Sequence, residues 1–394
     1  MRSGGTGRGS VGVLSAGVAF VGGRWVEGVE VRHEAGRIRS VKRVRGAGKG
    51  RILLPGLVNA HAHLELTFLG GRLAPAPFPE WARRLMEERA KRSPGDIEES
   101  IREGIRRSVA AGTAAVGDFA WLSKNDALRQ SGLRSVSWRE AIGIAPERAD
   151  EAARRALGFL ERKTSTWSPG LAPHAPYSCS GELYRRLFLE ARRARVPFAT
   201  HLSELREEVE YLRSGGGPFR DMLRRLGRDA GTWRPPRKRP APYLAWLGAL
   251  RGATAAHANY LTAADVALLR RFRVAVVWCP RTHAFFGHPA HPVKRLLRAG
   301  VPVALGTDSL GSSPTLDVRG EIRAATARGL SLETALRMAT EHGARALGLR
   351  RSGRIAAGCA ADFTVIGGEL PGDLLDGPVL EVIVAGRRPV VSQL

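Results

Sequence analysis

Two histidines stand two residues apart in the segment NAHAHLEL, which covers residues 59–66. The segment directly follows the apolar run ILLPGLV, which is typical of a buried β-strand. Because alternate side chains of a strand point to the same face, His61 and His63 could both bind one metal ion. Alternatively, both are ordinary structural histidines at a strand end. The positions of other possible metal ligands in the sequence distinguish the two interpretations.

Other residues able to bind a metal ion also close β-like runs. They are His174, His201, His257 and Asp308. A single histidine at a strand end is usually structural, but five that converge with an aspartate favour a metal site. Imidazoles with a carboxylate suit Zn²⁺ or Fe²⁺ and leave a position open for water. Zinc lowers the pKa of such a water from about 15.7 to about 7, which yields hydroxide at neutral pH.

Two glutamates lie next to these histidines. Glu204 follows His201 by three residues in THLSE, and it is a candidate for moving protons. An ordinary glutamate in the first turn of a helix is the alternative. Glu65 follows the histidine pair and is a candidate for binding a substrate hydroxyl or amine, or else a capping carboxylate.

Strand-like runs alternate with helical patterns through most of the chain, which is typical of βα units. Eight strands are expected, at residues 57–61, 113–119, 134–142, 170–176, 196–202, 253–258, 274–280 and 301–309. Helices are expected at residues 96–111, 180–194, 262–272 and 331–347, with Ser180 as an N-cap. The pattern predicts an α/β protein with a (β/α)8 TIM barrel, in which catalytic residues lie at the carboxyl ends of the strands.

Both ends of the chain carry short β-like runs separated by glycine turns. They predict a small composite β-sandwich domain made of residues 1–54 and 350–394. The metal-binding barrel is then expected at residues 55–349, with a long insert near 214–249. Connections of that length are typically lids or binding loops.

The chain has a formal net charge of +25 and 43% hydrophobic residues, so a globular protein is expected. Its arginines are spread along the chain, which favours a soluble basic surface over a binding face for nucleic acid or an anionic small molecule. The densest basic run, RPPRKRP at 234–240, is predicted to be a loop. The three cysteines lie far apart, which excludes a zinc ribbon. With no apolar run of membrane-spanning length, we expect a cytoplasmic protein without membrane partners.

Five segments resemble the amidohydrolase superfamily in order and spacing: LPGLVNAHAHLEL, HAPYSCS, THLSE, AHANYLT and VALGTDS. They are most similar to its mononuclear-metal deaminases of adenosine-like compounds and related aromatic amines. The terminal GRIAAGCAADFTVI resembles the small β domain of that superfamily. The resemblance implies one divalent metal, Zn²⁺ or alternatively Fe²⁺, bound by His61, His63, His201 and Asp308.

The same resemblance implies how water is activated. Glu204 and His257 would polarise and deprotonate the metal-bound water, and Asp308 would share the role of base. Glu204 would then protonate a ring nitrogen and the departing ammonia. His174 would contact the substrate; it stands where binuclear members carry a carboxylated lysine, so one metal is expected rather than two.

For the substrate, the chain looks most like aminofutalosine deaminases of the alternative menaquinone route. Deaminases of S-adenosylhomocysteine, methylthioadenosine and adenosine come next. Arg139 and Glu140 on the third strand are placed to reach a ribose or a carboxylate. Thr282 and His283 replace the usual Ser-Asn pair after Cys-Pro, and His283 is a candidate for contacting the substrate. The spacing of His283, His288 and His291 matches no closed zinc pattern, and their Gly/Pro context indicates a loop.

Two rival functions remain at this stage. One is a related amidohydrolase that releases chloride from a triazine or opens a cyclic amide. The other is a basic nucleic-acid-binding protein on a degenerate barrel, which would bind with steep salt dependence and need no metal. The intact set of metal ligands argues against the second rival. We therefore expect a small-molecule substrate, no nucleic-acid partner, and a homo-oligomer.

Overall fold

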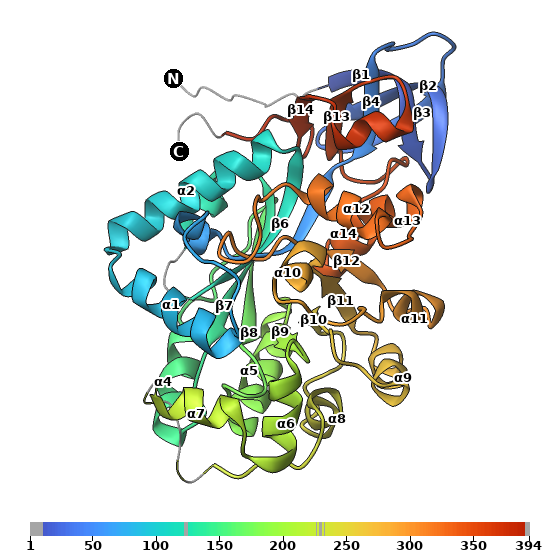
Figure 1. Ribbon diagram of the computed structural model, residues 1–394. Coiled ribbons are helices and arrows are strands. Elements are labelled where there is room, and N and C mark those ends of the chain that lie inside the picture. The colour runs from blue at the N-terminus through green and yellow to red at the C-terminus, as the bar shows by residue number, and fades with distance from the viewer. Residues whose placement is uncertain (1–10, 122–124, 226, 228–230, 232, 391–394) are drawn as a thin grey trace, which may run out of the picture.

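Eight parallel strands form the centre of the computed structural model, which describes residues 11–121, 125–225, 227, 231 and 233–390 (Figure 1). They make two four-stranded sheets, with the orders β5-β6-β7-β8 and β12-β11-β10-β9. Isolated parallel bridges join the sheets, from Leu171 to Phe198 and from Ala62 to Asp308. The strands are β5 (Leu57–Ala62), β6 (Thr113–Ala120), β7 (Arg134–Ala141), β8 (Trp167–Pro173), β9 (Ala199–Leu202), β10 (Thr254–His257), β11 (Ala275–Trp278) and β12 (Val303–Leu305). The expected α/β class is confirmed.

Apolar side chains from these strands form one continuous cluster. Phe119 and Trp138 are its largest members, and alanines and valines of the other strands pack with them. Both aromatic side chains are fully buried. His61 lies against this layer, with its ring centroid 4.5 Å from that of Phe119.

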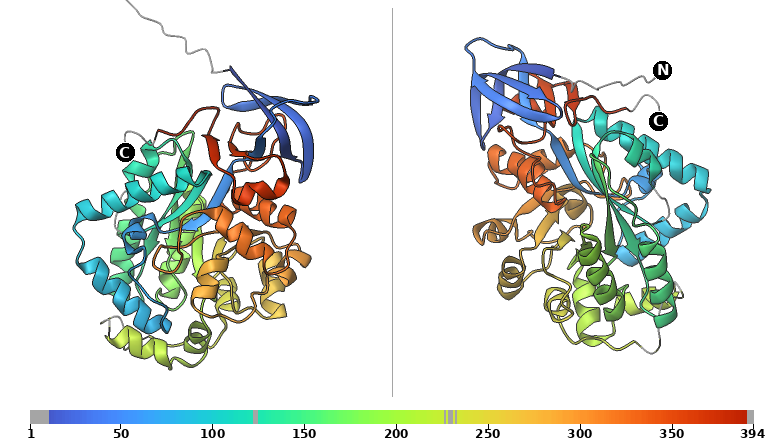
Figure 2. Two further views of the ribbon diagram at one scale, coloured as in Figure 1. Left: turned by 45° about the horizontal axis from the view of Figure 1, so that its top comes forward. Right: turned by 180° about the vertical axis from the view of Figure 1, so that it is seen from behind.

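Helices follow most of these strands and cover the outside of the sheets (Figures 1 and 2). Along the first half of the chain they are η1 (Leu64–Leu69), α1 (Phe78–Ala90), α2 (Pro94–Ala110), α3 (Asp126–Gln130), α4 (Pro146–Leu157), α5 (Gly181–Ala194) and α6 (Arg206–Ser214). The later helices are α7 (Pro218–Arg225), α8 (Pro240–Trp246), α9 (Ala263–Arg271), α10 (Pro280–Phe285), α11 (Val293–Arg298), α12 (Val318–Thr326), α13 (Leu332–Arg337), η2 (Met338–His342), α14 (Gly343–Ala346) and η3 (Pro371–Leu375).

Capping side chains determine where several helices begin. The expected N-cap Ser180 is confirmed, because its hydroxyl accepts the backbone N–H of Leu183. A capping box, formed by Thr262 and Asp265, starts α9. These caps pair the otherwise unbonded amide groups of the first helical turn.

The helix expected at residues 331–347 is continuous but not uniform. It consists of α13, a π-helical turn η2, and α14. A Cβ atom on Gly343 would lie 2.7 Å from Cβ of Val58. A glycine is therefore needed for the helix to approach β5 this closely.

The two ends of the chain meet in one six-stranded sheet, of order β14-β13-β4-β1-β2-β3. Its strands are β1 (Val11–Val21), β2 (Arg24–Glu34), β3 (Arg37–Arg43), β4 (Arg51–Pro55), β13 (Phe363–Gly367) and β14 (Val379–Ile383). β13 pairs antiparallel with β4, and only Gly56 separates β4 from β5. The sheet lies at one end of the molecule, away from α7 and α8 (Figure 2). A sandwich of two sheets and the exact domain boundaries stay predictions.

The expected insert near 214–249 contains two helices, α7 and α8, instead of a single long loop. The basic run at 234–239 is irregular, as expected, and α8 begins at Pro240. Within the described residues, no helix has both the length and the apolar character needed to cross a membrane.

Candidate metal centre and active site

Four histidines from three strands and one loop meet at the carboxyl ends of the parallel strands. The metal-binding ring atoms of His61, His63 and His201 lie within 4.8 Å of one another. The ring of His201 lies between those of His63 and His257, which are nearly parallel to it at interplanar angles of 12° and 20°. The ring of His61 stands edge-on to all three. The sequence-predicted histidine pair is thus part of a larger cluster.

Asp308, which follows β12, completes this cluster. Its Oδ1 atom lies 3.7 Å from Nε2 of both His61 and His63. The backbone N–H of Ser309 donates to the same oxygen at 2.8 Å. Burial raises the pKa of Asp308 to about 7. A cation held beside this carboxylate would favour its charged form.

Burial keeps the four imidazoles in the form that binds metals. It lowers the pKa of His201 to about 4, and it holds the pKa values of His61, His63 and His257 well below 6.5. Nδ1 of His201 donates to the carbonyl oxygen of His174 at 3.0 Å, which fixes the tautomer and leaves Nε2 as the ligand atom. The rings are therefore neutral donors near pH 7.

The backbone is strained where these side chains enter the site. Ser203, His257 and Asp308 have φ angles of 50°, 69° and 60°, in the left-handed region that non-glycine residues seldom adopt. Such conformations cost about 1–3 kcal/mol each and persist only when the surrounding structure fixes them. The strain indicates that the positions of these side chains are maintained although the backbone conformation is unfavourable.

Glu204 lies beside the cluster, and its carboxyl group is buried. Its Oε1 atom is 3.6 Å from Nε2 of His257. Burial, followed by the nearby carboxylates of Asp308 and Glu208, raises the pKa of Glu204 well above 4.5. Glu208 accepts the backbone N–H groups of Ser203 and Glu204 at 3.1 and 2.8 Å. These bonds hold the turn that presents Glu204 to the site.

The donor set fits one divalent metal ion. Both ring nitrogens of His61 are buried and have no hydrogen-bond partner in the described part of the chain. Such an orphaned pair is costly unless something else binds it. Three imidazoles and one carboxylate would satisfy Zn²⁺ or Fe²⁺ and leave an open position. His61, His63, His201 and Asp308 could therefore hold the ion.

A cavity of about 170 Å³ opens directly above this cluster. Its wall includes the sequence-predicted residues Glu65, Glu140, His174, Glu204 and His257, which therefore face one space. His174 is held by Ser178, whose hydroxyl lies 2.8 Å from Nδ1. The opening gives a small molecule access to the metal centre.

Two carboxyl groups in this cavity differ in their surroundings. Glu65 is buried and paired with Arg89, whose Nη2 lies 2.8 Å from Oε1, and the guanidinium of Arg89 stacks over the ring of Trp121. Glu140 is also buried, and burial raises its pKa to about 8. Its Oε1 atom lies 3.7 Å from Nδ1 of His201. Glu65 can accept from a ligand as a carboxylate, whereas Glu140 can donate as a carboxylic acid.

Arg139 and His283 are not among the described residues that line this cavity. Neighbouring residues of a strand face opposite ways, so Glu140 points into the cavity while the guanidinium of Arg139 lies 5.4 Å from the ring centroid of Phe159. Nδ1 of His283 lies 3.1 Å from Oδ1 of Asn259, behind the site. Direct contacts of Arg139 and His283 with a substrate stay predictions.

The sequence analysis missed the apolar wall of the cavity. We expected no element at residues 78–90, but α1 brings Phe78, Trp81 and Met86 to the site, and Phe286 and Met222 complete the wall. The segment FPEWARRLMEERA has apolar residues at helical spacing, which could have revealed the helix. Nothing in it indicates that the helix reaches the metal centre.

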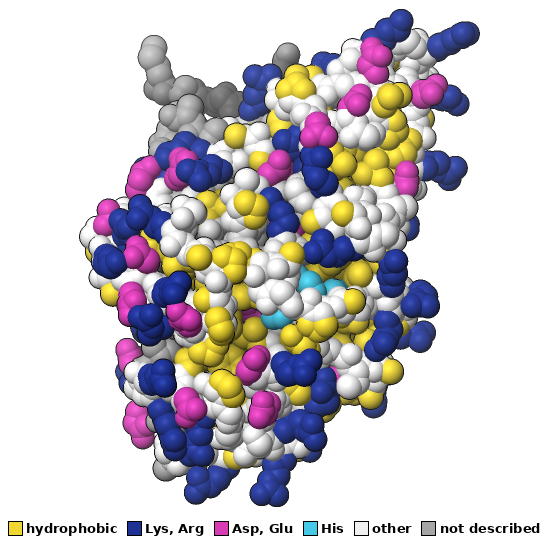
Figure 3. Space-filling model, in the orientation of Figure 1, with side chains coloured by type: hydrophobic (Ala, Val, Ile, Leu, Met, Phe, Trp, Pro, Cys, Tyr) yellow, Lys and Arg dark blue, Asp and Glu magenta, His cyan; other side chains and the backbone are white. Residues whose placement is uncertain are grey.

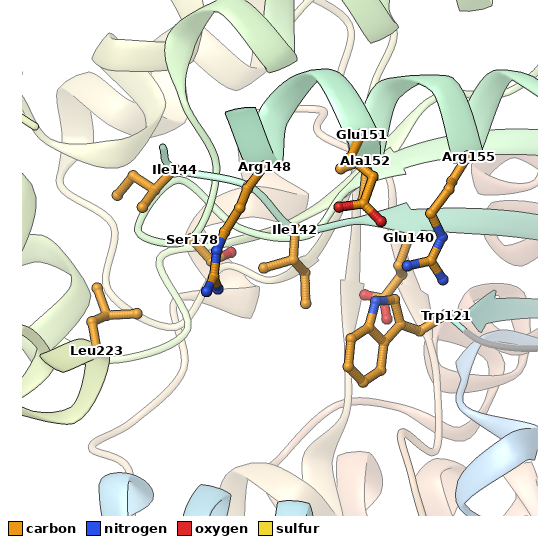
Figure 4. A pocket seen from close by; sticks show the side chains of 12 residues that line it. Trp121, Glu140, Ile142, Ile144, Arg148, Glu151, Ala152, Arg155, Ser178 and Leu223 are labelled. Carbon is orange, nitrogen blue, oxygen red and sulfur yellow. The ribbon is translucent and has the colours of Figure 1, made fainter. Parts of the chain in front are cut away.

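A side arm of about 300 Å³ continues from the cavity between β7 and α4 (Figure 4). It shares Trp121, Glu140 and Ser178 with the main cavity. Figure 4 shows Arg148 reaching from α4 toward Ser178, and Arg155 toward Glu140. The arm thus offers two guanidinium groups beside the cavity.

Comparison with known proteins identifies the family of this chain. Residues 52–388 match the amidohydrolase family. The chain belongs to that family. As expected from the sequence, this amidohydrolase is a hydrolytic enzyme.

Three relatives illustrate the likeness. A 5-methylthioadenosine/S-adenosylhomocysteine deaminase from Syntrophobacter fumaroxidans is 32% identical over 337 residues, which cover 80% of this amidohydrolase and 72% of that protein. The crystal structure of an adenosine deaminase from Xanthomonas campestris with bound zinc is 26% identical, with a TM-score of 0.79 over 96% of this chain and 92% of that one. The aminofutalosine deaminase of Helicobacter pylori, in complex with methylthio-coformycin, is 21% identical with a TM-score of 0.85 over 95% and 99% of the chains, and it shares the fold.

Proposed function

We propose that this amidohydrolase removes the exocyclic amino group of an adenine nucleoside by hydrolysis. The observation that carries the proposal is the grouping of His61, His63, His201 and Asp308 around one point, with Glu204 and a cavity directly beside them. The reaction named for the Syntrophobacter fumaroxidans relative supports the same chemistry.

One divalent metal, Zn²⁺ or alternatively Fe²⁺, is proposed for this cluster. When bound, the cation supplies Lewis acidity, which makes water acidic enough to provide hydroxide near neutral pH. His174 stands where a lysine would be needed to support a second ion, so we propose a single metal per chain. Metal analysis near one equivalent would agree with this, and a value near two would contradict it.

Glu204 is proposed as the residue that moves protons. Its buried carboxyl group, whose pKa is raised by burial, can take a proton from the attacking water and deliver it to a ring nitrogen; it can then take the second proton from the newly formed hydroxyl group and give it to the amino group that leaves as ammonia. Nε2 of His257 lies 3.6 Å from Glu204 and can orient the attacking oxygen by a hydrogen bond. Asp308 is proposed to share the role of base. Together these groups stabilise the negative charge that develops as the ring is attacked.

The remaining polar residues of the cavity would bind the nucleoside. His174 and Glu140 face the space above the metal centre, and Glu140 can donate a hydrogen bond while it is protonated. Glu65, held in place by Arg89, can accept hydrogen bonds from sugar hydroxyls. The aromatic rings of Trp81 and Phe286 offer flat surfaces for a base or an aromatic substituent.

The side arm favours a nucleoside that carries an extended substituent ending in an acid group. Arg148 and Arg155 line it together with Glu151 and Glu140, and guanidinium groups bind carboxylates strongly. Adenosine itself would leave the arm empty. Together with the sequence resemblance, this favours aminofutalosine as substrate, followed by S-adenosylhomocysteine, and a role in the alternative menaquinone route in the cytoplasm.

The arrangement of the eight parallel strands is also part of the proposal. We propose that the two four-stranded sheets act as one closed (β/α)8 barrel, since bridges link both pairs of edges. Closure would explain how ligands from β5, β9 and the end of β12 meet at one point, because the carboxyl ends of barrel strands form a ring.

An ammonia-release assay on the metal-loaded protein tests the proposal. The panel would hold adenosine, methylthioadenosine, S-adenosylhomocysteine and aminofutalosine, and we expect the highest kcat/KM for aminofutalosine. If none of them releases ammonia while a chlorotriazine releases chloride or a cyclic amide is opened, the deaminase proposal is wrong. Release from adenosine alone would keep the reaction and reject the extended substrate.

A further inference from the structure

A second cavity, of about 970 Å³, lies next to the metal centre, between α10, α11 and the loop after β10. Six cationic side chains line it, and no aspartate or glutamate is among its described lining residues. The six are Arg206, Arg239, Lys294, Arg295, Arg298 and Arg328. In Figure 3, histidine side chains show near the middle of the visible face, with Lys and Arg side chains to the right of and below them.

Some arginines in other parts of the molecule are paired with carboxylates. On α2, for example, Arg107 pairs with Glu103 at 2.7 Å. In the second cavity, Arg239 is paired with Asp265 at 2.8 Å. The described structure gives Lys294, Arg295, Arg298 and Arg328 no carboxylate within 4.0 Å. Glu321 interacts with Arg328 from farther away, but the side chains that line this concave surface still carry more positive than negative charge, and concave surfaces focus electrostatic potential.

Hydrogen-bond donors accompany the cations on the floor of the cavity. The hydroxyl of Tyr260 lies 3.1 Å from Nδ1 of His288. When that hydroxyl donates to Nδ1, the Nε2 atom of His288 carries the hydrogen and can donate to a ligand. His283, His288 and His291 also line this cavity or its floor, and burial lowers the pKa of each of them. The floor thus suits an anion and not a cation.

We propose that this cavity binds a small polyphosphate anion of the di- or triphosphate class. Guanidinium groups bind phosphate oxygens in pairs, and their number here suits a ligand with several negative charges. A monovalent carboxylate would leave most of the positive charge uncompensated. The volume is large enough for several linked phosphate groups.

The shape of the cavity favours a small anion over a nucleic acid. Its cations line one open hollow, whereas binding a strand takes a groove that follows the backbone and aromatic platforms for successive bases. Tyr260 is an aromatic residue at this hollow, but it is engaged with His288. A single compact ligand therefore fits the arrangement best.

The wall between the two cavities is shared with the active site. Nε2 of His291 donates to the carbonyl oxygen of His257 at 2.9 Å. Nδ2 of Asn259 donates to the carbonyl oxygen of Glu204 at 2.9 Å, while Oδ1 of Asn259 lies 3.1 Å from Nδ1 of His283. An anion bound in the second cavity would thus lie next to the residues that hydrogen-bond to the backbone of Glu204 and His257. The proposed anion site does not depend on deaminase activity.

Isothermal titration of the full-length, metal-loaded protein with inorganic triphosphate tests the proposal. We expect saturable binding of one equivalent that weakens as sodium chloride is added, because salt screens exposed charges. The variant R295E/R298E should lose at least tenfold in affinity. The matched control is R192E/R345E, which changes the net charge equally at exposed positions outside the cavity and should bind like the wild type.

Four further measurements make the test decisive. Triphosphate can also chelate the metal, but this would affect both charge-reversal variants equally. Only a difference in affinity between the two variants therefore supports binding in the cavity. Metal content is measured before and after the titration. Circular dichroism verifies folding, and R295Q/R298Q should give an intermediate loss. Equal losses in both charge-reversal variants would overturn the proposal in favour of bulk charge. Absence of binding would also overturn it, as would tighter binding of a single-stranded oligonucleotide at the same salt concentration.

Discussion

The two neighbouring cavities differ in the burial of their ionisable side chains. Above the metal centre, His201 is 4% exposed and Asp308 is 8% exposed, and burial shifts the pKa of each toward its neutral form. In the second cavity, the side chains of Arg295 and Arg298 are exposed to solvent. The difference teaches that the buried site offers neutral imidazoles and a carboxyl group that a bound cation would ionise, whereas the second cavity offers exposed cations to an anion.

The largest effect is expected from removing a metal ligand. His201→Ala deletes one imidazole from the cluster, so metal affinity should fall by more than about 100-fold, the loss seen when only a partner of a ligand is removed. Turnover should fall with it. Metal content after dialysis and ammonia release measure the two effects. The control His342→Ala alters a histidine on η2 that bonds to the carbonyl oxygen of Val303, and it should keep the metal.

A smaller effect is expected from removing the proposed proton carrier. Glu204→Gln keeps the size of the side chain but cannot transfer a proton, so kcat should fall by about 10²- to 10⁴-fold. Metal content should stay at the wild-type level. An active Glu204→Gln enzyme would reject the proton-transfer role. Glu210→Gln, at an exposed position on α6, is the matched control and should have no effect on kcat.

The side arm should show a still smaller effect that depends on the substrate. Arg148→Gln removes one guanidinium, so KM for a nucleoside with a terminal carboxylate should rise by about 10-fold, which corresponds to about 1.4 kcal/mol. KM for adenosine should not change. Arg154→Gln on the same helix serves as control. Equal changes for both substrates would mean that Arg148 supports the structure and does not bind the acid group.

A separate effect concerns stability, and not activity, near the first cavity. Burial raises the pKa of Asp118 to about 7, above its value of 3.8 in an unfolded chain. Its stabilising contribution is therefore complete below pH 3.8 and is lost as pH rises toward 7, by at most about 1.4 kcal/mol per pH unit. Asp118→Asn should remove this pH dependence in urea unfolding between pH 4 and 8. The control Asp150→Asn, at an exposed site, should leave the pH dependence of the free energy of unfolding intact. If Asp118→Asn also leaves that pH dependence unchanged, Asp118 is ionised in the folded protein.

Periodicity and strand-end residues predicted most of what positions the metal centre. All eight expected parallel strands are present, and the structure brings together His61, His63, His201, His257 and Asp308. The prediction worked because strand ends have a fixed place in a parallel fold, so the position of a residue in its strand determines where it points.

Residues that meet through helices and loops were harder to predict. Adjacent strand residues face opposite sides, so a shift of one residue decides between Arg139 and Glu140, and the structure places Glu140 in the cavity. Trp81 reaches the site from α1, and no local sequence pattern predicts the orientation of this helix relative to the strands. The second cavity gathers cations from distant segments, among them Arg239 and Arg328, whose closeness depends on tertiary packing alone.

The junction at Gly56 has a consequence for biosynthesis. β5, which carries His61, begins one residue after β4, and β4 pairs with β13 at residues 363–367. During translation, the amino end of β5 can therefore gain its final anchor only after nearly the whole chain has been made. The first ligand in the sequence is among the last to be fixed in place, so acquisition of the metal belongs to the end of folding and not to its beginning.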